Sequence, residues 1–223
     1  MSSSTPEKGH SSHREIALEQ GAIDTNEGPA HPSGISNPAP LGLISFASTT
    51  FIVSMYNVNA RGITIPNVVV GMGIFTGGFT QFIAGMWEFP RGNVFGATAF
   101  STYGAFWMAY ATIFIPGSGI LAAYDDPKEL ANALGIFLIA WFLVTVFFLL
   151  VVLRRNISFA VLLSSACVVF GCLAAGEFTQ SLRVTKAGGV FGIITALVAF
   201  YVGLSEMMGA ERRPLLRLPT GNL

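Results

Sequence analysis

Charged residues are scarce in this chain, and histidine and cysteine are scarcer still. Only 11% of its 223 residues are charged, against about 25% in soluble domains, while 52% are hydrophobic. The histidines, His10, His13 and His31, all precede the first apolar run, and no HExxH or CxxC spacing occurs anywhere. A metal site therefore has no support, and we expect no cofactor.

Other absences narrow the class further. The net charge is zero, which argues against nucleic acid as a partner, and no Walker or dinucleotide-binding glycine motif is present. Cys167 and Cys172 lie five positions apart in one apolar run, so they face different sides of a helix and cannot form a disulfide. No nucleophile–base set is recognisable, and an enzyme is not expected.

Long apolar runs dominate what is present. Each is near or above the roughly 20 residues that span about 30 Å of hydrocarbon. The six runs are 39–58, 66–87, 93–115, 130–153, 157–176 and 186–208. Backbone groups in lipid must bond within their own segment, so these runs should be helices. The sequence therefore predicts an all-α integral membrane protein, a six-transmembrane-helix bundle in the lipid bilayer.

Composition divides the chain into three parts. Residues 1–36 are rich in Ser, His, Gly, Pro and Glu and are predicted to be disordered. Residues 37–208 form the transmembrane domain, and residues 209–223 form a short C-terminal tail.

The basic residues predict the orientation of the spans. With six spans, eight of the 12 Lys and Arg residues fall on the side of the termini. This imbalance predicts that both termini are cytoplasmic in a multi-pass plasma-membrane protein.

Polar side chains within the apolar runs are nearly all uncharged. We expect a polar lining from Thr49, Gln81, Asn93, Thr98 and Ser101. The alternative is that such hydroxyls bond to the preceding helical turn or join helices together. Glu88 lies at the end of a run, beside Pro90 and Arg91, and is expected to be structural or gating rather than a proton carrier in mid-membrane.

Small residues recur every seven positions on two of the predicted helices. They are Gly71, Gly78 and Gly85 on one helix, and Ala97, Gly104 and Ala111 on the next. Stripes of this kind let helix backbones approach closely in lipid, so we expect tight packing within the bundle and contacts between subunits.

The stretch NPAPLGL, 37–43, opens the first apolar run. Asn37 is a good N-cap, and Pro38 suits the first helical position. Pro38 and Pro40 have no N–H, so the Asn37 side-chain oxygen should accept from the Ala39 N–H. The Asn37 NH₂ group would then be spare at the membrane entrance, where it could bind a small anion. Gly42 should let a backbone or a ligand come near. The alternative is a simple helix start.

NPAPLGL also resembles the signature of the acetate uptake transporter family, the succinate–acetate permeases. The resemblance continues through GMGIFTGGFTQFIAGMWEFPRGNVFGATAFSTYGAFW (71–107), GLSEMMG and the late LPTG. It implies a homo-hexamer of six-helix subunits that moves acetate and related short carboxylates, with proton coupling proposed. The long polar tail resembles that of fungal members.

The resemblance also implies roles for particular residues. Asn37, Pro38 and Leu41 belong to the entrance motif, and Phe46 and Tyr103 match aromatic residues that narrow the pore. Ala166 falls at a third constriction position, where many bacterial members carry a larger Leu. The Tyr103 hydroxyl is expected to donate to a passing carboxylate.

The sequence therefore predicts a transporter or channel for short carboxylates. Two alternatives remain open. One is a receptor-like sensor of acid stress that signals through the 36-residue tail, and the other is an ammonia exporter with a narrow neutral pore.

Overall fold

The computed structural model describes residues 34–154 and 156–221, and its regular elements there are all helical. Five segments are single long helices: α2 (Ala39–Asn57), α5 (Val94–Ile113), α6 (Pro127–Val152), α7 (Ile157–Thr179) and α8 (Leu182–Gly209). A sixth is continuous but changes its winding: α3 (Val69–Gly71), the π-helical η2 (Met72–Thr80) and α4 (Gln81–Glu88). Short 3₁₀ turns lie in the connections, at Ala60–Gly62, Pro116–Ser118 and Leu121–Ala123. Most of the tail that is predicted to be disordered, residues 1–33, lies outside the described residues.

Five of these segments are long and apolar enough to cross a membrane: α2, Val69–Glu88, α6, α7 and α8. The remaining helix, α5, has 20 residues and would extend about 30 Å. Its Ser, Thr, Tyr and Gly residues make it less apolar, and 10 of its 20 residues are buried in the bundle. The chain is thus a helical membrane protein, and half of the α5 residues are buried against neighbouring helices.

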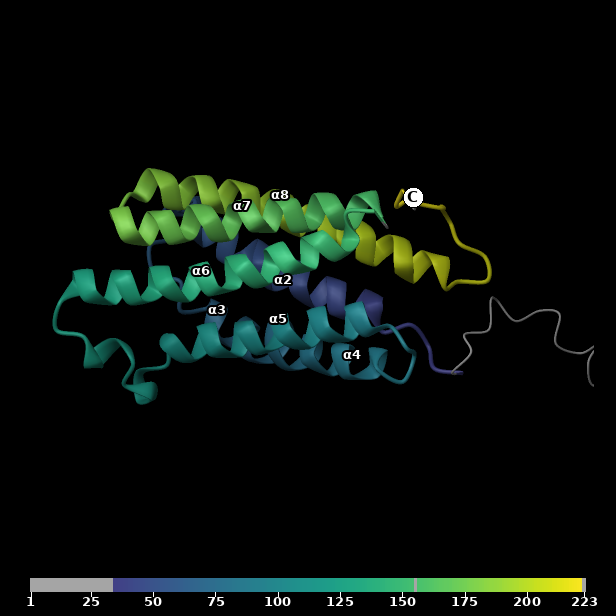
Figure 1. The fold of residues 1–223 in the computed structure, drawn as a ribbon, viewed down its shortest axis with the longest axis horizontal. Helices are drawn as coiled ribbons and strands as arrows, with labels where there is room; N and C mark the ends of the chain where they lie inside the picture. The colour runs from purple at the N-terminus through teal and green to yellow at the C-terminus, as the bar shows by residue number, and fades with distance from the viewer. Residues whose placement is uncertain (1–33, 155, 222–223) are drawn as a thin grey trace, which may run out of the picture.

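The long helices lie alongside one another down the length of the molecule (Figure 1). α2 packs along α8, α8 along α7, and α7 along α6; on its other side α2 meets η2 and α4, which pack on α5. This order of contacts would close into a ring between α5 and α6, but these two helices make few contacts with each other. Side chains rather than close backbone packing therefore close this last seam.

Polar side chains fix where three of the helices begin. Asn93 Oδ1 accepts from Gly96 N at the start of α5, Asp126 Oδ1 accepts from Lys128 N at α6, and Asn156 Oδ1 accepts from Phe159 N at α7. Each bond satisfies a backbone donor that has no partner within its helix.

The glycine stripes bring η2 and α4 against α5. A Cβ at Gly104 would meet backbone atoms of Phe82 and Gly78, and one at Gly85 would meet the backbone of Ser101. Gly71 is different, because a Cβ there would meet nothing within 4 Å. The prediction that Gly71 shares the packing face is therefore wrong within this chain. Gly73 does so instead, against Ala111.

The segment after α8 folds back onto the bundle. The Tyr201 and Ser205 hydroxyls donate to the carbonyls of Pro219 and Leu218, both at 2.7 Å. The Gly221 carbonyl accepts from Ile157 N, the first residue of α7, at 2.8 Å. The late LPTG motif thus joins the end of α8 to the start of α7.

Replacing Gly104 by alanine should destabilise the bundle by about 1–3 kcal/mol, because the backbone atoms that the new methyl group meets cannot move aside cheaply. Thermal unfolding of the detergent-solubilised protein measures this loss. Gly71→Ala is the matched control and should change the midpoint little. Equal shifts in the two variants would contradict the packing described for this stripe.

Candidate functional site

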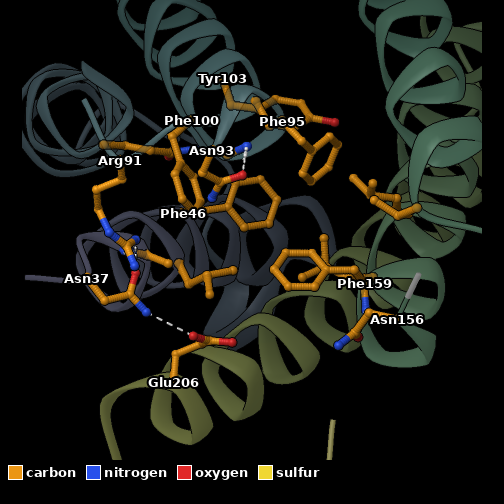
Figure 2. A pocket seen from close by; sticks show the side chains of 18 residues that line it. Asn37, Phe46, Arg91, Asn93, Phe95, Phe100, Tyr103, Asn156, Phe159 and Glu206 are labelled. Atoms are coloured by element: carbon orange, nitrogen blue, oxygen red, sulfur yellow. Dashed lines mark hydrogen bonds between the residues drawn. The ribbon is translucent and has the colours of Figure 1, made fainter. Parts of the chain in front are cut away.

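The first residue of the NPAPLGL stretch makes a long-range hydrogen bond that the sequence does not show. Asn37 Oδ1 accepts from Ala39 N at 3.0 Å, as predicted, but Pro38 is the N-cap and Ala39 the first helical residue. The prediction that the Asn37 amide is spare is wrong, since its Nδ2 donates to Glu206 Oε2 of α8 at 2.9 Å (Figure 2). At Gly42 the Phe100 ring, rather than a backbone, comes close.

Arg91 extends this contact into a network. Its Nη1 donates to Asn37 Oδ1 at 2.8 Å and to Glu88 Oε2 at 2.9 Å. The Glu88 side chain is 0% exposed and that of Arg91 is 10% exposed, so the ion pair is largely shielded from water. The network joins the end of α4, the α4–α5 turn, the start of α2 and the last turns of α8. The sequence gives little sign of this network, because most of its members lie far apart along the chain; the spacing of three between Glu88 and Arg91 is the one local signal.

An entrance cavity of about 320 Å³ lies beside this network (Figure 2). Polar residues line part of it: Asn37, Gln81, Arg91, Asn93, Asn156 and Glu206. Rings and aliphatic side chains make up most of the rest, among them Leu43, Phe46, Phe95, Phe100, Tyr103 and Phe159.

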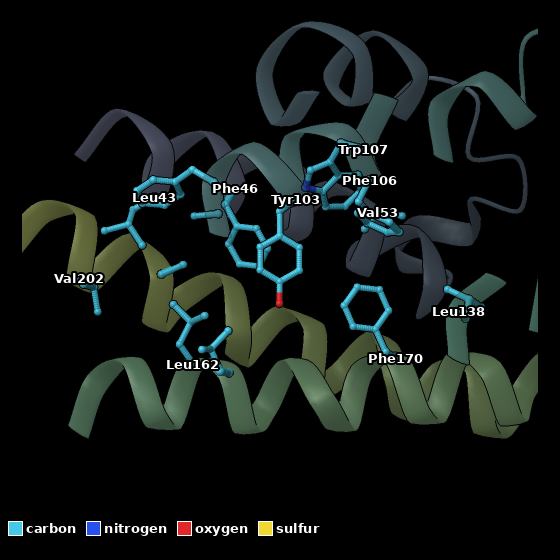
Figure 3. Packing of buried hydrophobic residues seen from close by; sticks show 14 of the residues in the cluster. Leu43, Phe46, Val53, Tyr103, Phe106, Trp107, Leu138, Leu162, Phe170 and Val202 are labelled. Carbon is cyan, nitrogen blue, oxygen red and sulfur yellow. The ribbon is translucent and has the colours of Figure 1, made fainter. Parts of the chain in front are cut away.

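A pair of aromatic rings, Phe46 and Tyr103, lies in the wall of the entrance cavity. The Phe46 and Tyr103 ring centroids are 5.6 Å apart, and both side chains are buried (Figure 3). Phe46 also lines a second cavity of about 260 Å³, whose wall includes Ala166. The structure thus places Phe46 between two cavities, with Tyr103 facing the entrance cavity and Ala166 the second one.

The Tyr103 hydroxyl is already engaged. It donates to Thr145 Oγ1 of α6 at 2.9 Å, and the Thr145 hydroxyl donates in turn to the Trp141 carbonyl at 2.7 Å. In this conformation its proton is therefore directed to Thr145, and donation to a passing carboxylate stays a prediction. The bond instead joins α5 to α6 across the seam where their backbones hardly touch.

The other predicted polar residues divide into two groups. Gln81 and Asn93 line the entrance cavity, although the Asn93 oxygen is used as a helix cap. Thr49, Thr98 and Ser101 line neither cavity. Thr49 is buried against Gly77, and the Thr98 hydroxyl donates to Val94 O of its own helix at 2.8 Å.

The entrance-motif residues are also divided. Asn37 lines the cavity, whereas Pro38 and Leu41 do not, and the Leu41 side chain is 48% exposed. Sequence reasoning missed most residues of the second cavity, Trp107 and Phe170 among them, because buried aromatic side chains look alike in any apolar run.

Two cavities that share Phe46 lie inside a bundle of membrane-spanning length, an arrangement that fits a membrane transport protein. The signature of the GPR1/FUN34/yaaH family matches residues 20–223, and the chain belongs to this family. Proteins similar to this chain are named as a permease, a transporter and a channel rather than as enzymes, which agrees with the expectation from the sequence that the chain is not an enzyme.

Three similar proteins are informative. Ammonia transport outward protein 2 of Saccharomyces cerevisiae is 46% identical over 81% of this chain and 64% of its own length. Acetate permease A of Emericella nidulans is 40% identical over 76% of this chain and 61% of its own length. The bacterial acetate channel SatP matches with a TM-score of 0.74 at 32% identity, over 83% of this chain and 99% of that one. This chain therefore spans less than two thirds of the first two relatives and nearly all of the bacterial channel.

Replacing Glu88 by glutamine should lower the free energy of unfolding by about 2 kcal/mol, because the nearly buried Arg91 then loses its counter-charge. Glu206→Gln is the matched control: Glu206 is only partly buried, and a Gln carbonyl could still accept from Asn37. Thermal unfolding of both purified variants tests the difference. A larger loss in Glu206→Gln would mean that α8, and not the ion pair, stabilises the entrance.

Proposed function

We propose that this protein carries acetate and related short-chain carboxylates across the plasma membrane, with or without a coupled proton. The observation that supports the proposal most is the presence of two cavities that share Phe46, whose ring packs on the buried Tyr103 ring. Rings packed at that distance exclude hydrated ions, whereas a small solute with a methyl group could pass as side chains move.

The charges along the path favour weak binding. Arg91 and Glu206 line the entrance cavity, Glu177 lines the second, and the constriction between them is uncharged. A carboxyl group would thus meet amide and hydroxyl groups rather than a strong cationic trap. Conduction requires a solute to enter readily and also to leave readily.

The similar proteins support the same substrate class. One relative is named an acetate permease, and the solved structure that matches nearly end to end is an acetate channel.

We also propose the finer architecture that the resemblance implies: six spans, both termini in the cytoplasm and a homo-hexamer. Support comes from the length of α5 and from large apolar side chains exposed on the outside of the single chain, such as Phe75, Phe79 and Trp87. Lipid or neighbouring subunits would cover this surface.

Ammonia is a second candidate, because two relatives are named ammonia transport outward proteins. A narrow path with an uncharged constriction suits a small neutral molecule as well. The two candidates are distinguished by measuring both solutes in the same liposomes.

Purified protein in liposomes should take up labelled acetate faster than empty liposomes do, and unlabelled acetate should compete. Repeating the measurement with and without an imposed pH gradient shows whether a proton accompanies the substrate. Uptake equal to that of empty liposomes, from protein that is shown to be folded and inserted, would refute the proposal. If the protein speeds the movement of ammonia but not that of acetate, the second candidate is favoured.

Phe46→Ala should join the two cavities and admit larger acids, because this ring lines both. We expect lactate and succinate to compete several-fold better against labelled acetate in the variant. Val53→Ala, which shortens a buried side chain of the second cavity on the same helix, is the matched control and should leave the competition profile unchanged. An unchanged profile in well-inserted Phe46→Ala protein would remove Phe46 from the gate.

A further inference from the structure

One polar side chain in the entrance cavity differs from the others. Those of Asn37, Asn93, Asn156, Tyr103, Arg91 and Glu206 all have hydrogen-bond partners. Gln81 is 0% exposed, yet neither its Nε2 nor its Oε1 has a partner among the residues that the structure describes. It is also one of the largest side chains that are fully buried.

An unsatisfied buried amide is costly, because each unpaired group has given up its bonds to water without replacement. An apolar side chain of similar length, such as methionine, would fill the same space without that cost. Gln81 is also the first residue after the π-helical turns of Met72–Thr80, and short π-helical insertions often lie at functional sites. Its position in the cavity wall and its two unpaired atoms together indicate that a ligand completes the site.

We infer that Gln81 binds the carboxyl group of the substrate in its neutral, protonated form. The inference rests on the proposed function and adds the chemical species to it. A primary amide presents an N–H donor and a C=O acceptor side by side, and a carboxylic acid presents a C=O acceptor and an O–H donor in the same arrangement. The two groups can form a pair of hydrogen bonds that satisfies both Gln81 atoms. A carboxylate only accepts, so it would leave Oε1 facing a second oxygen.

The charges around the cavity favour the same form. Among the described residues that line it, Arg91 is the one cation, and it is bonded to the Glu88 carboxylate and to Asn37. Glu206 adds a carboxylate at the same mouth. An anion moving inward from there would leave water without gaining an unpaired cation, which is unfavourable in a largely apolar cavity. A neutral acid avoids this penalty and carries its own proton, so flux would be coupled to protons without a titrating carrier on the protein.

The test uses two neutral molecules of the same size as acetic acid. Acetamide offers a donor and an acceptor as the acid does, whereas acetone offers the acceptor alone. In liposomes that contain the wild-type protein, acetamide should inhibit uptake of labelled acetate and acetone should not. In Gln81→Met protein, acetate uptake should fall about tenfold through loss of two hydrogen bonds, and inhibition by acetamide should disappear.

Thr80→Val is the matched control. Thr80 directly precedes Gln81 and lines neither cavity, and its hydroxyl donates to the Phe75 carbonyl of its own segment. This variant should keep both acetate uptake and its inhibition by acetamide.

The outcomes separate the inference from the function on which it rests. Wild-type protein that moves no acetate would refute the proposed function itself. Wild-type protein that moves acetate but is insensitive to acetamide would overturn the inference alone, as would inhibition that survives in Gln81→Met protein. If Gln81→Met protein fails to insert, the comparison of acetamide with acetone in the wild type still decides.

Discussion

A polar group inside a bundle that faces lipid has to find its hydrogen-bond partner within the protein, because no water is available there. This requirement governs most of the polar side chains described above. Hydroxyls on the long helices donate to the carbonyl one turn earlier, as Ser48 does to Ile44 and Thr112 does to Met108. Against these satisfied hydroxyls, the buried groups of the described residues that have no partner, above all both polar atoms of Gln81, are informative about what the bundle encloses.

The entrance network follows from the same requirement. Pro38 and Pro40 have no N–H to offer, so the Asn37 oxygen is directed to Ala39 and remains able to accept from Arg91 as well. The Asn37 amide then reaches Glu206 on α8, 169 positions along the chain. A short proline-rich motif thus does more than begin a helix, because its Asn37 also bonds to residues far along the chain. It joins the two ends of the transmembrane domain at the mouth of the cavity.

Much of the fold could be predicted from local pattern, and much of the site could not. The six apolar runs lie close to the six helical segments, and the Asn37 oxygen does accept from Ala39. The partners of Asn37 and Tyr103 were missed because they lie far away in sequence, where spacing carries no signal. The error at Gly71 has a related cause. A seven-residue repeat assumes uniform α-helical winding, and the π-helical stretch that follows Gly71 changes which glycines face α5.

Glu88 shows how structure and transport are connected. A lone arginine at the cavity mouth would attract carboxylates strongly and release them slowly, which opposes conduction. The Glu88 carboxylate, 2.9 Å from Arg91 and shielded from water, offsets that charge while holding the guanidinium against Asn37. The entrance therefore keeps hydrogen-bond donors in fixed positions without a strong local field. Farther in, only uncharged groups line the constriction, so a small acid would find weak and similar binding along the path, as rapid passage in either direction demands.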